Sequence, residues 1–562
     1  MSKNKIPRIQ CCINGNFYYP ELSAGEDEPN IEEDYISFEL VIKLDLKIHP
    51  ENIKVVVNPI DNGENIIPEE QIILAVNKDS LALRKNKNEG YFMHFQLSEL
   101  RCRQAYQYQV FYNDQQLKIS GKDDDRVIFY TPPARRDPQP LKIAIGGDQE
   151  RHEQFNPFGT CFDLDNQKDT KLLYQHIGQK GKVRSIEIDN IDEKPYQLFI
   201  HLGDLFNGEL YFSLRNIFKP GRHIIEHRVK SLQAFRFHLD SDFVGPVGNN
   251  LAHMLINAVY DDHDTGGNNA GPPSNVKEQN IQKNMVDAFH ELLCMENFLS
   301  EKAKKGPYYS KRIGQTEFFY LHNRYTKEIN SESSYLLGTE QWSWLESNLE
   351  NSKAQHKVII SPLPFVMGKN PLEDYRAHWQ EWHRMMQLCR KHEIATILTA
   401  DSHNYSHSEL HVREHQDDRP WIIHQHLVGT LGGNSQSVSE DERESFTKPG
   451  RPPLLPQHPD FNDLLYDGST VKAYFSPGDK VALLPKSEGD SQWCTKDKWS
   501  KKTHAYAGLT FFPANKPKEA PQDSHLQDQS ASGWHVSTQL FTCSKKKHFV
   551  THDPRLDIEY GP

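Results

Sequence analysis

The stretch Tyr196 to Phe206, with the sequence YQLFIHLGDLF, is an apolar run of strand-forming residues that stops at Gly203 and presents Asp204. A short apolar run that ends in a glycine and a carboxylate is typical of a buried strand that carries an acid to a site. Four other runs also end in acids, histidines or a hydroxyl: LKIAIGGD at Asp148, LINAVYDDHD at Asp262 and His263, KVIISPLP at Ser361, and IATILTADSH at Asp401 and His403. Ligands bind beyond the carboxyl ends of the strands in open α/β sheets, so we expect these five ends to converge on one crevice.

The composition indicates a folded globular protein of several units. A length of 562 residues predicts two to four domains, and 36% hydrophobic with 25% charged residues is too balanced for a disordered chain. No apolar run approaches the roughly 20 residues that span a bilayer. The net charge of -12 argues against a nucleic acid partner.

The N-terminus and the cysteines bear on location. The segment MSKNKIPRIQCCINGN has no apolar h-region, and the 8 cysteines have no paired spacing. Both observations predict a cytoplasmic protein with reduced thiols, while export by a route without an N-terminal signal stays open.

Two patterns divide the chain. Residues 36–133 read as strand after strand with turn clusters between them, which predicts an N-terminal β-sandwich of immunoglobulin or fibronectin type over residues 1–136. The segment TPPARRDPQP then reads as a linker. Over residues 137–562 strands alternate with helical stretches, such as 334–353 and 374–392, which predicts an α/β layer architecture with a β-rich part from about residue 440.

The residues at the strand ends suit a two-metal site. Phosphoester hydrolysis needs charge neutralisation on the phosphate and an activated water, and two cations roughly 3.5 to 4 Å apart supply both. Hard oxygen ligands with one imidazole suit Mn, Zn, Fe or Ca. The candidate ligands are Asp148, Asp204, Asp262, Asp401 and His403. A hydroxide bound between the ions would attack phosphorus in line, and His263 would donate a proton to the leaving oxygen.

Taken singly, each of these acids is as typical of a turn or a helix N-cap as of a ligand. The loop DDHDTGGNNAG at residues 261–271 is more telling, because three acids beside His263 repel one another unless a cation lies near them.

Further polar residues are candidates for contacts around the site. Arg222 could grip a substrate phosphate, as could Arg228 or Arg236, with surface ion pairing as the alternative for each. His407 follows His403 by four residues and could reach the site, whereas structural or solvated roles are expected for His411 and His415. The glycines of GTLGG, residues 429–433, would allow a close backbone approach.

The motifs, in their order along the chain, resemble the PhoD-like branch of the calcineurin-type metallophosphatases. They are GGDQ from Gly146, HLGD from His201, YDDHD from Tyr260, LGTEQWSWLESNL from Leu337, ISP from Ile360 and TADSH from Thr399. The resemblance implies a four-layer sandwich of two mixed β-sheets flanked by helices, preceded by an all-β domain.

The resemblance also implies roles for the site residues. Asp148 and His403 would bind the first metal, Asp262 and Asp401 the second, and Asp204 would bridge them. His263 would be the catalytic histidine, with Asp264 as its orienting partner. Ser361 would be a weak ligand or a substrate contact, and Gln149 and Glu150 are unassigned candidates near the first motif.

Three motifs depart from the family pattern. Gly147 and Asp148 stand where many members have a cysteine, and Asn207 stands where they have a tyrosine, which argues against an iron–tyrosinate centre. Asn207 could instead contact the phosphate. The usual LDTR-like segment appears as LHNR, Leu321 to Arg324, with His322 in place of the acid.

The sequence therefore predicts a metal-dependent phosphohydrolase that acts on a small phosphoester, with phosphomonoesters as the expected substrates. A phosphodiesterase with the same two-metal site is the nearest alternative. A metallophosphatase fold without activity, serving as a binding scaffold, is another, and a sugar-binding lectin-like protein has only scattered aromatic residues in its favour.

Overall fold

The computed structural model describes most of the two predicted regions. The described residues are 6–20, 29, 34–46, 48, 50–60, 73–82, 91–119, 127–149, 164–180, 196–205, 209–210, 227–228, 235, 239, 245–265, 271–273, 275–293, 308–324, 326, 328–329, 334–366, 375–403, 405–412, 421–429, 431, 473–475, 503–514, 533–544, 550–552 and 557–561. Residues 435–459, whose polar and proline-rich sequence predicts a loop, and residues 480–485, whose sequence KVALLP predicts a strand, lie outside them.

The N-terminal region is built of strands, as predicted. They are β1 (Ile9–Tyr18), β2 (Tyr35–Leu44), β3 (Ile53–Pro59), β4 (Ile73–Ala82), β5 (Tyr91–Arg101), β6 (Ala105–Tyr112), β7 (Gln115–Gln116) and β8 (Val127–Tyr130), with the 3-10 helix η2 (Pro50–Asn52). Antiparallel β1, β2, β5 and β4 are paired in this order, β4 also pairs with β3, and β3, β6, β7 and β8 continue the sheet on the other side of the region's core. Phe38 of β2 stacks on Phe129 of β8 at 5.0 Å between ring centroids, so apolar side chains of the two layers meet.

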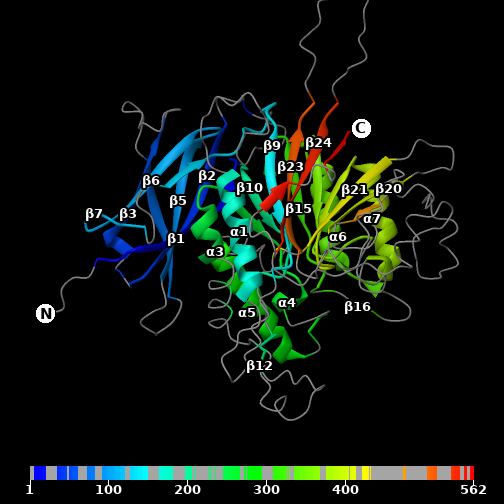
Figure 1. Ribbon diagram of the computed structural model, residues 1–562, viewed down its shortest axis with the longest axis horizontal. Helices are drawn as coiled ribbons and strands as arrows, with labels where there is room; N and C mark the ends of the chain where they lie inside the picture. Colours follow the sequence, from blue (N-terminus) through cyan, green and yellow to red (C-terminus); the bar gives the residue numbers. More distant parts are fainter. Residues whose placement is uncertain are drawn as a thin grey trace, which may run out of the picture.

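A first sheet of the remaining chain contains three parallel strands. These are β9 (Leu141–Gly146), β10 (Leu198–His201) and β13 (Leu255–Ala258). The C-terminal strands β23 (Thr503–Phe512), β24 (His535–Ser544), β25 (Val550–His552) and β26 (Ile558–Tyr560) extend this sheet antiparallel from β9. Helices α1 (Leu164–Lys180), α3 (Gly245–Leu251) and α5 (Val276–Leu293) lie beside it (Figure 1).

Strand β1 joins the N-terminal layer to this sheet, because it pairs parallel with β13 and antiparallel with β2. Figure 1 shows the blue N-terminal strands continuing the sheet on its left side. Strand β1 has only a weak signal in the sequence, since its run IQCCINGNFY is interrupted by polar residues and a glycine.

A second sheet packs against the first. Its strands are β14 (Tyr309–Ile313), β15 (Thr316–Tyr320), β18 (His356–Ile360), β19 (Thr396–Thr399), β21 (Trp421–Val428), β20 (Tyr405–Val412) and β22 (Ala473–Phe475) in spatial order. Helices α6 (Gly338–Asn351) and α7 (Trp379–Lys391), with the 3-10 helix η9 (Tyr375–His378) before α7, lie against it. Short elements complete the described chain: β11 (Glu209–Leu210), β12 (His227–Arg228), α4 (Asp262–Thr265), β16 (Glu328–Ile329) and β17 (Ser334–Tyr335).

Alternate residues of the second sheet enter different cores. Phe318 and Tyr320 belong to the core shared with the first sheet, whereas Phe319 between them packs with α6 and α7. This period of two is what a strand buried on both faces requires. The helices predicted at 334–353 and 374–392 are present as α6 and α7, and they bury Trp342 and Leu345 on α6 and Trp382 on α7. The predicted order of helices, sheet, sheet and helices is therefore confirmed.

The linker after the N-terminal region is anchored on both sides. Arg135 is buried, and its Nη2 donates to Asp34 Oδ1 at 2.8 Å. Arg312 of β14 donates from Nη2 to the Arg135 carbonyl at 3.1 Å. The segment 131–140 has no helix or strand, as its prolines predict. The domain boundary at residue 136 stays a prediction.

Among the described helices, none combines the length and the apolar character needed to cross a bilayer.

Three histidines and a tyrosine are buried together around β20 and β21. His407 Nε2 lies 3.0 Å from His424 Nδ1, and His426 Nε2 lies 3.1 Å from the Tyr560 hydroxyl of β26. The Tyr560 ring stacks on His424 at 3.7 Å. Burial lowers the pKa of His426 to about 3, so this imidazole is neutral in the folded protein at ordinary pH.

The histidine cluster makes stability depend on pH. Between about pH 6.5 and about pH 3, His426 binds a proton in the unfolded chain only, so the free energy of unfolding falls as the pH falls through this window. In this window the unfolded chain binds about one more proton than the folded protein because of His426, and we expect His426→Gln to remove this difference. The slope of the free energy of unfolding against pH should then fall by about 1.4 kcal/mol per pH unit. Urea unfolding at several pH values, with a chelator present throughout, measures it. An unchanged slope would contradict the prediction.

Candidate metal centre

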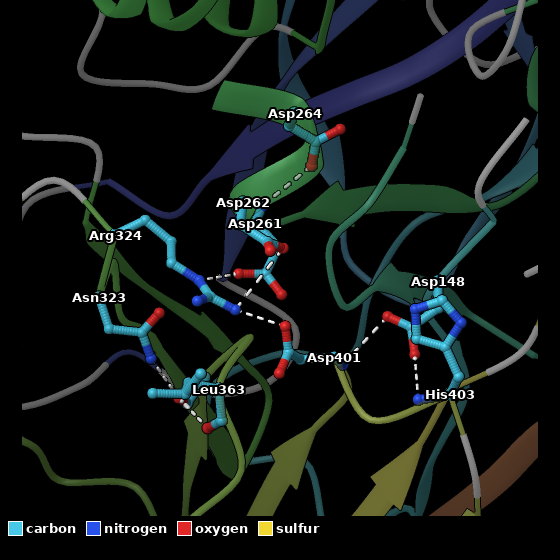
Figure 2. A network of polar contacts seen from close by, with 10 residues as sticks. Asp148, Asp261, Asp262, Asp264, Asn323, Arg324, Leu363, Asp401 and His403 are labelled. Carbon is cyan, nitrogen blue, oxygen red and sulfur yellow. Dashed lines mark hydrogen bonds and ion pairs between the residues drawn. The ribbon is translucent and has the colours of Figure 1, made fainter. Parts of the chain in front are cut away.

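The five predicted strand ends lie at one end of the packed sheets. Asp148 follows β9, Asp204 follows β10, and Asp262 and His263 open α4 after β13. Ser361 follows β18, and Asp401 and His403 follow β19. The strands in each set are parallel, so their carboxyl ends point the same way. Figure 2 shows the carboxylates of the two sheets gathered in one region.

Four of the candidate ligands have backbone conformations that favour glycine. The φ angles are 52° at Asp148, 54° at Asp204, 67° at Asp401 and 51° at His403. Such a conformation costs a residue with a side chain about 1 to 3 kcal/mol. Backbone strain at four candidate ligands is typical of a functional site, where the required geometry is kept at a cost in local stability.

The first group of ligand atoms belongs to Asp148, Asp204 and His403, which each place one such atom within 4.8 Å of the others. Asp148 is fixed by the loop after β19, because its Oδ1 accepts the Asp401 N–H at 3.0 Å and its Oδ2 accepts the His403 N–H at 3.1 Å. Figure 2 shows these two bonds joining the sheets at the site.

Asp204 is the least satisfied carboxylate of the centre. Its side chain is 1% exposed, and neither carboxylate oxygen has a hydrogen-bond partner among the described residues. Burial, followed by the charges of Asp262, Asp261 and Asp148, raises its pKa well above the usual range. A buried carboxylate without a donor is costly unless a cation balances it. Asp204 also belongs to a second group of ligand atoms, with Asp262 and His263.

The third group of ligand atoms belongs to Asp261, Asp262 and Asp401, and the guanidinium of Arg324 lies among these carboxylates. Its Nε donates to Asp261 Oδ1 and its Nη2 to Asp401 Oδ1, while Nη2 lies 3.6 Å from Asp262 Oδ1. Burial lowers the pKa of the guanidinium, but the surrounding carboxylates more than offset this effect and the pKa lies well above its ordinary value. Arg324 is therefore a charged group at the heart of the centre (Figure 2).

Asp264 holds two loops of the centre together. Its Oδ1 accepts the Leu205 N–H at 2.8 Å, and its Oδ2 accepts the Asp261 N–H at 2.9 Å. Each oxygen thus fixes the backbone beside another aspartate of the centre. The role of Asp264 in orienting His263 stays a prediction.

Glycines allow the close approach of the segments. A Cβ at Gly429 would lie 2.2 Å from Asp148 Oδ2 and 3.0 Å from the His403 backbone nitrogen. A Cβ at Gly203, where φ is +113°, would lie 2.8 Å from the Asp261 Cβ. The close approach predicted for the GTLGG segment is confirmed at Gly429.

The other predicted residues have different surroundings. Ser361 donates from Oγ to the Leu363 carbonyl at 2.7 Å and accepts from Asn323 Nδ2 at 2.9 Å. Gln149 accepts from the Tyr174 hydroxyl at 2.5 Å. His407 lies on β20 within the histidine cluster. Their roles at the site stay predictions. The predicted candidates Glu150, Asn207, Arg222, Arg236 and His415 lie outside the described residues.

Sequence reasoning missed Asp261 and Arg324. Asp261 was visible beside Asp262 and His263, but nothing in its position separates a ligand from a turn former. Arg324 stands at the end of the run TEFFYLHNR after β15, so the rule that drew attention to the other strand ends applied to it as well.

The residues present fit a bound cation. Carboxylate oxygens and one imidazole, from Asp148, Asp204 and His403, are donors that first-row metals and calcium accept. The two Asp204 oxygens that have no hydrogen-bond partner among the described residues support the same conclusion.

Comparison with known proteins gives the class of this fold and site. The structure superposes on a solved structure of PhoD with a TM-score of 0.56 at 15% identity, over 98% of this chain and 90% of that chain. A purple acid phosphatase, PPD1 from yellow lupin (Lupinus luteus) seeds, gives a TM-score of 0.49 at 11% identity, over 95% and 73% of the two chains. A search by sequence among curated proteins gave no match.

The fold is shared with PhoD, and the carboxylate–histidine centre has the ligand types that a metal-dependent phosphohydrolase requires. The profile of the PhoD-like phosphatases matches residues 181–462, half of the sequence, and the chain belongs to this family. The protein is thus a phosphoesterase, and the resemblance seen in its motifs is confirmed.

The contact at Gly429 predicts the effect of one added methyl group. We expect Gly429→Ala to push Asp148 and the His403 backbone apart and to weaken Mn²⁺ binding by about 10- to 100-fold. Gly178→Ala is the matched control, because its Cβ would meet the Asn250 carbonyl at 2.3 Å, between α1 and α3. Calorimetric titration of both variants measures the affinity. If Gly429→Ala lost stability but bound Mn²⁺ as tightly as the wild type, the predicted effect of this contact on metal binding would be wrong.

Proposed function

We propose that this phosphoesterase is a phosphomonoesterase whose cation is held by Asp148, Asp204 and His403 and whose proton donor is His263. The family description as phosphatases favours monoesters. The observation that carries the proposal is the buried Asp204 carboxylate, which lies between the group with Asp148 and His403 and the group with Asp262 and His263.

The cation would supply charge neutralisation on the phosphate and Lewis-acid activation of the attacking water. The chain's own residues hold the remaining parts. His263 is 6% exposed, opens α4, and has a ring nitrogen within 4.8 Å of carboxylate oxygens of Asp204 and Asp262. An imidazole at this position can donate a proton to the leaving oxygen.

The overall reaction balances with His263 as the acid. The oxygen of water forms a bond to phosphorus, the bond from phosphorus to the ester oxygen breaks, and the leaving oxygen takes a proton from His263. The proton released by water restores the imidazolium after the products leave. An alcohol and inorganic phosphate are formed from one ester and one water.

Asp204→Asn tests whether the buried Asp204 carboxylate is needed to hold the cation. The substitution keeps shape but removes charge, so we expect turnover of an aryl phosphate to fall by about a thousandfold, or about 4 kcal/mol in the activation barrier. The metal-free protein should be at least as stable as the wild type, because the cost of burying an uncompensated carboxylate disappears. Phosphate release after refilling with Mn, Zn, Fe or Ca, and urea unfolding, measure the two effects.

The control for this experiment is Asp114→Asn, since Asp114 is an exposed partner of Lys54 in the N-terminal region. Full activity of Asp204→Asn would refute the proposal. Faster hydrolysis of a bis-ester than of a monoester by the wild type would replace the monoesterase by a phosphodiesterase. No hydrolysis of either ester with any metal would favour an inactive scaffold.

His263→Ala tests the proton donor. We expect the loss to be about 10²- to 10⁴-fold for an alkyl phosphate, whose leaving oxygen needs a proton, and much smaller for a nitrophenyl phosphate, whose leaving oxygen does not. His552→Ala, at a half-exposed histidine bound to Asp557, is the control. Comparison of kcat for the two esters measures the difference. Equal losses on both esters would assign His263 to binding instead of proton transfer.

A further inference from the structure

The second cation that the sequence predicts would be bound by Asp262 and Asp401, yet the structure has a guanidinium there. Arg324 lies among Asp261, Asp262 and Asp401 and pairs with all three. We propose that Arg324 takes the place of a second metal ion, so that the centre binds one cation per chain, at Asp148, Asp204 and His403. The inference rests on the proposed function, because it concerns the same centre.

The carboxylates of the centre are unevenly neutralised, because Arg324 places one positive charge beside Asp261, Asp262 and Asp401 and forms no ion pair with Asp204. Asp261 and Asp401 accept hydrogen bonds from Arg324. Arg324 does not reach Asp204, because both oxygens of that carboxylate lack a partner among the described residues. The protein thus places a positively charged side chain beside Asp261 and Asp401, whereas a bound cation would have to neutralise Asp204.

The position of Arg324 is fixed by the second sheet and α6. The Leu321 N–H donates to the Ile360 carbonyl at 2.8 Å. Gln341 of α6 accepts the His322 N–H at 2.8 Å and donates to the His322 carbonyl at 2.7 Å. Asn323 donates to Ser361 at 2.9 Å. The segment that carries Arg324 is therefore held on both sides, so the guanidinium has a defined place.

Displacing this guanidinium by a metal ion would be costly. The Arg324 side chain is fully buried, and an arginine without its carboxylate partners would be an uncompensated buried charge. A cation bound between Asp262 and His263 would also stand close to Arg324, since Nη2 lies 3.6 Å from Asp262. Like charges at such separations repel strongly at low dielectric constant.

The count of bound metal ions tests the inference. Metal-stripped protein is equilibrated with Mn²⁺, passed through a desalting column, and analysed for manganese per chain and for magnetic coupling by electron paramagnetic resonance. We expect one uncoupled Mn²⁺ in the wild type. Arg324→Met, which keeps length and removes charge, should bind two coupled ions, because Asp261, Asp262 and Asp401 are then open to a cation.

Three further variants complete the design. Arg324→Lys keeps the positive charge and should bind one ion. Arg324→Met with Asp261→Asn removes a carboxylate from the opened group and should return the count toward one. Arg384→Met, at a half-exposed arginine paired with Glu346, is the matched control and should also bind one.

Each outcome decides the matter. Two Mn²⁺ in the wild type overturn the role of Arg324 whatever the variants do, and turnover by that protein would leave the proposed function standing. One Mn²⁺ in both the wild type and Arg324→Met also overturns it. No bound Mn²⁺ in the wild type would defeat the proposed function itself. If Arg324→Met fails to fold, the wild-type count still tests the inference.

Discussion

The concentration of buried negative charge between the two sheets is the constraint on which the centre depends. Asp148, Asp204, Asp261, Asp262 and Asp264 are all nearly inaccessible to solvent. Carboxylates in such surroundings need donors or cations to stay ionised. The protein meets this need in three ways: with backbone N–H groups at Asp148 and Asp264, with a guanidinium at Asp261, and with a place for a cation at Asp204.

The two-sheet architecture makes this concentration possible. Parallel strands bring their carboxyl ends to one edge in each sheet, and packing of the sheets brings the two edges together. The segments approach so closely that Gly429 and Gly203 have no room for a side chain. Asp148 spans the gap by accepting N–H groups from the other sheet, so the geometry of the centre depends on how the sheets are packed.

The sequence predicted the strands and helices that have a clear local pattern. Apolar runs with a following acid located β9, β10, β13 and β19, and the helical stretches between strands located α6 and α7. Strand β1 was missed because its pairing with β13 compensates for a weak local pattern. The pairing of Arg324 with three carboxylates was missed although the residue follows a strand end, because those carboxylates are distant from it in sequence. Contacts of that kind leave no periodic trace in the chain.

The placement of β23 has a consequence for biosynthesis. Strand β9, which carries Asp148, lies between β10 and β23, and residues 503–512 are translated more than 350 residues after it. At ribosomal rates this delay is on the order of half a minute. During that time β9 has an open edge on the side that β23 will cover, and such an edge can pair with other chains. In a nascent chain of this topology, that edge of β9 therefore stays unpaired by its native partner until translation reaches β23.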